Sequence, residues 1–218
     1  MTPHSLAQEC HVAVPGARRG EDTLLALIAE GQGLWTREQQ HAGAEKFLAA
    51  LDGLVRQYQP EIIGFCVEML QGTGIQGEDI AQEVFVAAYT TMPHFEARAS
   101  LRTWLYRIAR NRCAHVLRDE TRHLQSLATH HEPVMHGAHR AAELSPEQQL
   151  QHQEELAQVH ASLTQLREAD RTMLILTYMR ELTTEQIAEI LMIAPQQVRL
   201  RRSRALQRLR MVVNHDAQ

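Results

Sequence analysis

The sequence is poor in aromatic residues, in cysteine and in long apolar runs, and its only lysine is Lys46. Aromatic residues make up 5% of the 218 residues, so we expect cores built mostly from Leu, Ile, Val, Ala and Met. No apolar run reaches the roughly 18 residues of a membrane-spanning helix. Residues 1–19 also lack the apolar centre of a secretory signal. We therefore expect no membrane insertion.

The three cysteines, Cys10, Cys66 and Cys113, are far apart and form no CxxC pair. This spacing argues against a disulfide framework and against a cysteine-based zinc site, and it favours a reducing cytoplasm. Cys113 lies among arginines, which could acidify its thiol. A redox role is thus open for Cys113, but a small buried hydrophobic residue is the favoured interpretation.

Familiar catalytic motifs are absent: the sequence contains no HExxH, no nucleophile elbow and no paired carboxylates in a cleft-like context. We therefore expect no enzyme activity, no catalytic residue and no cofactor. Histidine is abundant, with 13 residues, and five of them lie between residues 123 and 146. Such a cluster could bind zinc, nickel or copper and support a metal-dependent enzyme. We favour a polar linker without a metal site, because the cluster has no cysteine nearby and no i,i+4 pair on a firm helix.

Helical periodicity runs through almost the whole sequence, and no segment alternates as a strand does. The predicted fold is all-α, with two small helical domains joined by a flexible linker. Pro60 marks a point where a helix restarts, and residues 31–43 form a loop. We expect helices over residues 21–30, 44–58, 61–70, 79–92, 101–122, 147–166, 168–180, 184–191 and 195–213. The predicted parts are a tail over 1–20, a first domain over 21–122, a linker over 123–146 and a second domain over 147–213.

Two arginine-rich blocks interrupt an otherwise acidic chain whose net charge is −4. Residues 94–122 carry seven basic and three acidic side chains, and residues 195–210 carry six basic and none acidic. Every basic residue in both blocks is Arg, which binds phosphate with a bidentate fork and also reads guanine edges. One such block could be a solvated helix face. Two blocks favour a polyanionic partner.

Residues 183–213 have the pattern of a helix-turn-helix. Thr183 and Gln186 have capping-box spacing, and Pro195 suits the first position of a helix after a turn over 192–194. Such a final helix fits the major groove of DNA, with its N-terminal residues at base edges. Base or phosphate contacts are expected from Gln196, Gln197, Arg199 and Arg201. The alternative is a packed helical hairpin whose arginines face solvent.

The stretch from residue 95 to residue 107 places aromatic side chains among arginines. This mixture suits single-stranded nucleic acid, because a base stacks on an aromatic ring while Arg neutralises the backbone. The loop over 95–100 could hold a flipped base. Trp104 and Tyr106 could instead be core residues, and for Trp104 the two interpretations stay equally open.

An acidic helix face precedes that loop. Asp79, Gln82 and Glu83 are expected to point outward together, while Ile80, Val84 and Phe85 point inward. Taken alone, such a face is typical of a solvated helix.

Residues 77–122, with DIAQEVF and then FxxRASLRTWLYRIARN, resemble region 2 of the extracytoplasmic-function (group IV) RNA polymerase sigma factors. Residues 163–209, with LxxxDRxMLxLxY and then LTTEQIAEIL, resemble region 4 of the same family. Residues 21–31 and 44–70 resemble the family's first helices, separated by an unusual insertion. Two motifs in this order are far more specific than a helix-turn-helix alone.

The resemblance implies an alternative sigma factor, which binds core RNA polymerase and directs initiation at stress- or signal-responsive promoters. Asp79, Gln82 and Glu83 would contact the β′ clamp helices, and the second domain would contact the β flap. The loop that captures a base of the −10 element would comprise Phe95, Glu96, Ala97, Arg98, Ala99 and Ser100. Strand separation and backbone binding would involve Arg102, Trp104, Arg107, Arg110 and Arg112. The −35 element would be read through Gln196, Gln197, Arg199, Arg201, Arg202 and Arg204.

The resemblance also implies control by an anti-sigma factor, which is often membrane-bound and would hold this cytoplasmic protein at the inner membrane. The sequence departs from the family at several positions. Met192 stands where the family has Gly, Ala194 replaces the usual Ser or Thr cap, and Trp104-Leu105 replaces the two adjacent tryptophans of primary sigma factors. The alternative function is a free-standing helix-turn-helix regulator with the first domain as a sensor, which would not need polymerase.

Overall fold

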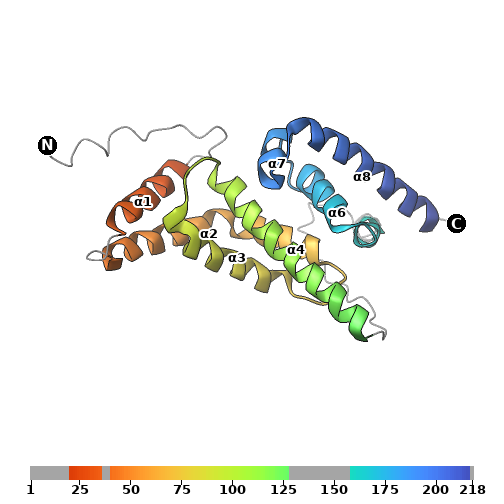
Figure 1. Ribbon diagram of the computed structural model, residues 1–218, viewed down its shortest axis with the longest axis horizontal. Helices are drawn as coiled ribbons and strands as arrows, with labels where there is room; N and C mark the ends of the chain where they lie inside the picture. The colour runs from red at the N-terminus through yellow and green to blue at the C-terminus, as the bar shows by residue number, and fades with distance from the viewer. Residues whose placement is uncertain (1–19, 36–39, 128–157, 217–218) are drawn as a thin grey trace, which may run out of the picture.

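The computed structural model describes residues 20–35, 40–127 and 158–216, and within these ranges it contains helices and turns but no strand. The all-α prediction is therefore confirmed. The helices form two bundles that lie side by side, the first from α1 to α4 and the second from residue 158 to the end of α8 (Figure 1). Residues 128–157, which hold most of the predicted linker, lie outside the described residues.

The first bundle is built on one long helix. It contains α1 (Glu21–Leu34), α2 (Gln40–Leu70), α3 (Gly77–Thr91), the short 3-10 helix η1 (Met92–His94) and α4 (Leu101–Leu127). α2 buries a continuous row of apolar and aromatic side chains, namely Phe47, Leu54, Tyr58, Ile62, Phe65 and Met69. The spacing of three or four residues keeps this row on one face of the helix, which packs against α1, α3 and α4.

Pro60 does not divide two helices, and the prediction of separate helices over 44–58 and 61–70 was wrong. α2 runs through the proline without a break. Proline removes one backbone hydrogen bond and crowds the preceding turn. Tyr58 and Ile62 on either side are both fully buried, so tertiary packing outweighs this local cost.

The predicted loop over 31–43 is shorter than expected, because α1 extends to Leu34 and α2 begins at Gln40. Gly31 lies in α1 where a Cβ atom would come within 2.7 Å of the Phe47 ring. The Trp35 ring packs on the same phenylalanine, with ring centroids 5.3 Å apart. These aromatic contacts explain why a glycine-containing, polar segment is helical. α4 is likewise longer than predicted and ends at Leu127, so residues 123–127 belong to a helix and not to a linker.

The second bundle contains a helix over residues 158–164, α6 (Glu168–Leu174), the π-helical segment η2 (Ile175–Met179), α7 (Thr184–Leu191) and α8 (Pro195–Asp216). Its core is aliphatic, as the composition predicts, and includes Leu163, Met173, Leu176, Ile187, Val198 and Ala205. An ion pair between Arg208 and Asp170, with Nη1 2.6 Å from Oδ2, ties α8 to α6.

The two bundles pack against each other, and their buried apolar residues form one continuous cluster. Arg171 of α6 is buried and donates to three backbone carbonyls: Leu163 at 3.0 Å, Thr164 at 2.5 Å and Met69 of the first bundle at 2.9 Å. Nη2 of Arg180 lies 2.5 Å from Oε1 of Glu68 in α2. The two predicted helical domains are thus present as two bundles, and in this structure they are in contact with each other.

Candidate nucleic-acid interface

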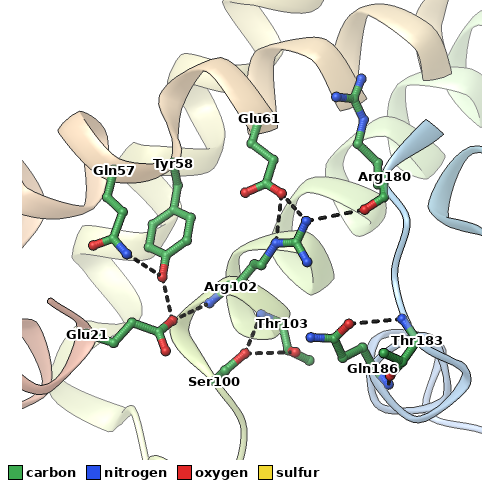
Figure 2. A network of polar contacts seen from close by, with 10 residues as sticks. All are labelled: Glu21, Gln57, Tyr58, Glu61, Ser100, Arg102, Thr103, Arg180, Thr183 and Gln186. Atoms are coloured by element: carbon green, nitrogen blue, oxygen red, sulfur yellow. Dashed lines mark hydrogen bonds and ion pairs between the residues drawn. The ribbon is translucent and has the colours of Figure 1, made fainter. Parts of the chain in front are cut away.

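The helix-turn-helix has the local geometry that its sequence predicts. The Thr183 hydroxyl accepts from the backbone N–H of Gln186 at 3.2 Å, and the Gln186 side chain accepts from the backbone N–H of Thr183 at 3.0 Å (Figure 2). This capping box starts α7. Met192 ends α7 in the left-handed conformation at φ 54, and Pro195 begins α8. The turn is therefore made without the glycine that this conformation favours.

α8 presents one buried edge and one exposed arginine-rich face. Val198 and Ala205 are fully buried. Of the six residues expected at the −35 element, Arg202 is half-buried and the other five are exposed, namely Gln196, Gln197, Arg199, Arg201 and Arg204. Arg208, in contrast, is paired with Asp170 of α6 and supports the bundle. The exposed face is continuous with the N-terminal end of α8, which is the end that enters a major groove in this motif.

The loop before α4 is held at both ends and exposed at its tip. Ser100 is buried, and its Oγ accepts from the backbone N–H of Thr103 at 3.1 Å, which caps α4. Glu96, Ala97 and Arg98 are exposed. Ala97 has φ 51, a left-handed conformation that costs a non-glycine residue free energy. Strain of this kind concentrates at binding sites, where the surrounding structure maintains it.

The two aromatic residues of α4 have different environments. Tyr106 is fully buried and meets Phe65 edge-on, with centroids 5.3 Å apart, so the core interpretation holds for it. Burial, and next the charge of Glu61, raises the pKa of the Tyr106 hydroxyl. Trp104 is half-buried, and its ring packs on Phe95 of the loop at 4.7 Å between centroids. Trp104 therefore packs against the loop through its contact with Phe95.

The arginines of α4 reach across to the second bundle. Arg102 donates to Glu61 of α2 and, through Nη2, to the carbonyl of Arg180 at 3.3 Å (Figure 2). Nη2 of Arg107 donates to the carbonyl of Glu189 in α7 at 2.9 Å. Nε of Arg110 lies 3.8 Å from Oε1 of Glu168 in α6. Arg112 instead pairs within the first bundle, with its Nη1 3.6 Å from Oε2 of Glu83 in α3. Burial opposes the charge of Arg102, but the hydrogen bond and charge of Glu61 raise its pKa above the usual value.

The acidic face of α3 is exposed as predicted. Asp79, Gln82 and Glu83 are exposed, while Ile80, Val84 and Phe85 are buried. Val86, three residues after Glu83, is 63% exposed and adds an apolar contact surface to the same face. The sequence alone does not reveal that Val86 is exposed, because a single apolar residue within an amphipathic helix is ordinarily assigned to the core.

Only some of the other predicted features fall within the described residues. Among the described residues, no group of three or more His, Cys, Asp or Glu side chains is arranged to hold a metal ion. Four of the five clustered histidines, His130, His131, His136 and His139, lie outside these residues. Cys66 and Cys113 are buried free thiols, which agrees with the hydrophobic role favoured for Cys113. None of the described helices combines the length and apolar character that a membrane span requires.

Comparison with known proteins places this architecture in a family. Residues 54–123 match Sigma-70 region 2, and residues 156–209 match Sigma-70, region 4. The RNA polymerase sigma-H factor of Pseudomonas aeruginosa is 34% identical over 72% of this chain and 82% of its own length. The ECF RNA polymerase sigma factor SigW of Bacillus subtilis is 30% identical over 74% of this chain and 87% of its own length.

Solved structures show the same fold at lower identity. The sigma factor RpoE, in complex with the anti-sigma factor NepR from Bartonella quintana, superposes with a TM-score of 0.59 at 21% identity, over 75% of this chain and 96% of that one. CnrH, in complex with the cytosolic domain of CnrY, gives a TM-score of 0.55 at 20% identity, over 87% of this chain and 96% of that one.

These matches, together with the two helical bundles and their arginine-rich helices, make this chain a transcription initiation factor. The chain belongs to the extracytoplasmic-function sigma factors of the sigma-70 family. It is an alternative sigma factor, whose regions 2 and 4 bind core RNA polymerase and promoter DNA.

Proposed function

We propose that the exposed face of α3 docks this sigma factor on the β′ clamp helices of polymerase. Asp79, Gln82 and Glu83 supply polar and acidic contacts, and Val86 supplies an apolar one. Their exposure supports this role, because all four side chains are available without any rearrangement of the bundle. The second domain makes the further polymerase contact at the β flap.

We propose that the loop over 95–100 receives the flipped base of the −10 element and that α4 binds the adjoining strand. Three observations support the capture of a base by this loop. Its tip is exposed, Ala97 has a left-handed conformation, and the rings of Phe95 and Trp104 pack together beside it. Arg102, Arg107, Arg110 and Arg112 supply the charge for the backbone. The −35 element is read by the exposed face of α8, from Gln196 to Arg204.

The packing of the two bundles carries a consequence for this assignment. Arg102, Arg107 and Arg110 contact the second bundle, and region 2 and region 4 bind elements at two separate places on a promoter. We infer that the structure is a closed state and that the bundles separate when the factor binds polymerase and DNA. The domain boundaries proposed for this movement are 21–127, since α4 ends at Leu127, and 147–213, joined through 128–146, with 1–20 as a tail.

The closed state also provides a means of control. One structural neighbour is the sigma factor RpoE in complex with the anti-sigma factor NepR, and another is CnrH in complex with the cytosolic domain of CnrY. We propose that an anti-sigma factor holds the present chain inactive in the cytoplasm, where a membrane-bound inhibitor would keep it at the inner membrane. The chain itself acts without catalysis, because polymerase performs the chemistry.

Transcription in vitro tests this function. Run-off product from a cognate promoter should appear only when both core polymerase and this chain are present. The double variant Gln82→Ala, Glu83→Ala should lose association with core polymerase while its circular dichroism and melting temperature stay unchanged. The double variant Glu45→Ala, Gln59→Ala removes the same two kinds of side chain, one carboxylate and one amide, from exposed positions of α2 and should behave as the unmodified protein.

The alternative of a free-standing regulator makes the opposite prediction. Specific footprinting of the promoter by this chain alone, with the same pattern in the Gln82→Ala, Glu83→Ala variant, would support a regulator and would contradict the proposed docking face.

A further inference from the structure

Helix α1 takes part in none of the polymerase or DNA contacts proposed above, and it lies along the loop over 95–100. Near its C-terminal end, Nε2 of Gln32 donates to the carbonyl of Phe95 at 2.7 Å and to the carbonyl of Met92 at 3.2 Å. Met92 is the first residue of η1, and Phe95 directly follows η1, where the loop begins. One amide group therefore fixes the entry of the loop from 60 and 63 residues away in the sequence.

The N-terminal end of α1 holds the other end of the loop. Glu21 is 1% exposed, and its Oε1 accepts from the backbone N–H of Arg102 at 3.3 Å, in the first turn of α4 (Figure 2). The same oxygen accepts from the hydroxyl of Tyr58 in α2. A carboxylate at this place satisfies a backbone N–H that the helix itself leaves without a partner, and it lies favourably at the positive end of the helix dipole.

The loop between these two points needs such support. Its tip is exposed, and Ala97 holds a left-handed conformation that an unsupported loop would not keep. The ring of Phe95 must also stay over Trp104 if the two are to form a floor for a base. A donor on the Phe95 carbonyl at one end and an acceptor on the Arg102 N–H at the other fix the span between them.

We propose that Gln32 and Glu21 are positioning residues for recognition of the −10 element: they clamp the base-capturing loop from α1, and neither touches DNA. This inference rests on the role proposed above for the loop over 95–100. The clamp preorganises the loop, so its contribution appears as selectivity for the captured base rather than as affinity for polymerase or for DNA backbone.

The test is a measurement of base capture by the reconstituted holoenzyme. Core polymerase with this chain is titrated with a fork-junction promoter that carries either the captured base or an abasic site at that position. The dissociation constant of the abasic promoter divided by that of the promoter with the base measures capture of the base alone. In Gln32→Glu, which keeps the size of the side chain but replaces the donor by an acceptor facing two carbonyls, this ratio should fall about tenfold. In Gln32→Ala it should fall less, and Glu21→Ala should also lower it.

Matched controls come from the neighbouring positions of α1. Gly33→Ala changes the residue beside Gln32 at a place where a Cβ atom meets nothing within 4 Å. Asp22→Ala removes an exposed acidic residue from the same first turn as Glu21. Both should keep the ratio of the unmodified protein, and every variant should keep its affinity for core polymerase.

Two results would overturn the inference: an unchanged ratio in both Gln32 variants, or an equal fall in Gly33→Ala. Because Gln32 is only partly buried, its variants should fold even if Glu21→Ala does not. If the unmodified holoenzyme fails to distinguish the base from the abasic site at any −10 position, the role of the loop itself is wrong, and the clamp is rejected with it.

Discussion

The guanidinium of Arg180 lies against α2 at Gly64, where a Cβ atom would come within 2.7 Å of it. Gly64→Ala should displace Arg180 from Glu68 and weaken the contact between the bundles. The free chain should then expand in small-angle scattering. Its apparent affinity for core polymerase should rise about fivefold, since a larger fraction of molecules is already open. Gly33→Ala is the control, and an unchanged radius of gyration in both Gly64→Ala and Arg180→Ala would contradict a closed state held by this contact.

Arg171 joins the ends of two helices through backbone carbonyls alone. Arg171→Ala leaves the buried carbonyls of Met69, Leu163 and Thr164 without this donor and should lower the free energy of unfolding by about 3 kcal/mol. Burial lowers the pKa of Arg171, and the carbonyl oxygens at the two helix C-termini act in the opposite direction by favouring the cation. Urea unfolding measures the loss. Arg167→Ala, at an exposed position just before α6, should change it by less than about 0.5 kcal/mol.

Met192 ends α7 with φ 54 although its side chain is 77% exposed and makes little packing contact. Met192→Gly should therefore raise the free energy of unfolding by about 0.5–1 kcal/mol, because glycine adopts this conformation without a Cβ clash. Met192→Ala keeps the clash and should show no such gain. Equal stabilities for the glycine and alanine variants would show that the left-handed turn is not strained.

A hydrogen bond with Cys113, and after it burial, raises the pKa of the Cys66 thiol. The folded chain therefore keeps this thiol neutral above pH 9, while the unfolded chain ionises it near the ordinary value of 9.0. Stability from this group is present below pH 9 and is lost as the pH rises further, by about 1.4 kcal/mol per pH unit.

Urea unfolding between pH 8 and pH 10.5 measures this slope. In Cys66→Ala the slope should be shallower by that amount, whatever the variant's stability at neutral pH. An identical slope in both proteins would show that the thiol ionises in the folded chain, as a redox-active cysteine would.

Local sequence signals predicted the parts of the structure that local chemistry decides. Thr183 and Gln186 lie three residues apart, and their capping box requires only each other. The alternation of Ile80 and Val84 with Gln82 and Glu83 likewise follows from helix geometry alone. The start of α8 at Pro195 was predictable for the same reason, since proline fixes its own backbone angle.

Contacts between distant residues decided what the sequence did not reveal. α2 continues through Pro60 because Tyr58 and Ile62 are buried against other helices. Glu21 and Gln32 act on a loop whose residues lie 60 to 81 positions away. The arginines of α4 predicted a binding surface, but no spacing in the sequence indicated that the second bundle would cover part of it.

Three of the hydrogen bonds between the two bundles have a feature in common. Arg102, Arg107 and Arg171 each donate across the boundary to a main-chain oxygen, of Arg180, Glu189 and Met69 respectively. A main-chain oxygen is present whatever side chain its residue carries. Substitution at these three accepting positions therefore leaves the bonds in place, whereas replacement of a single donor arginine removes one. The ion pair between Arg180 and Glu68 differs, because a change of either side chain breaks it.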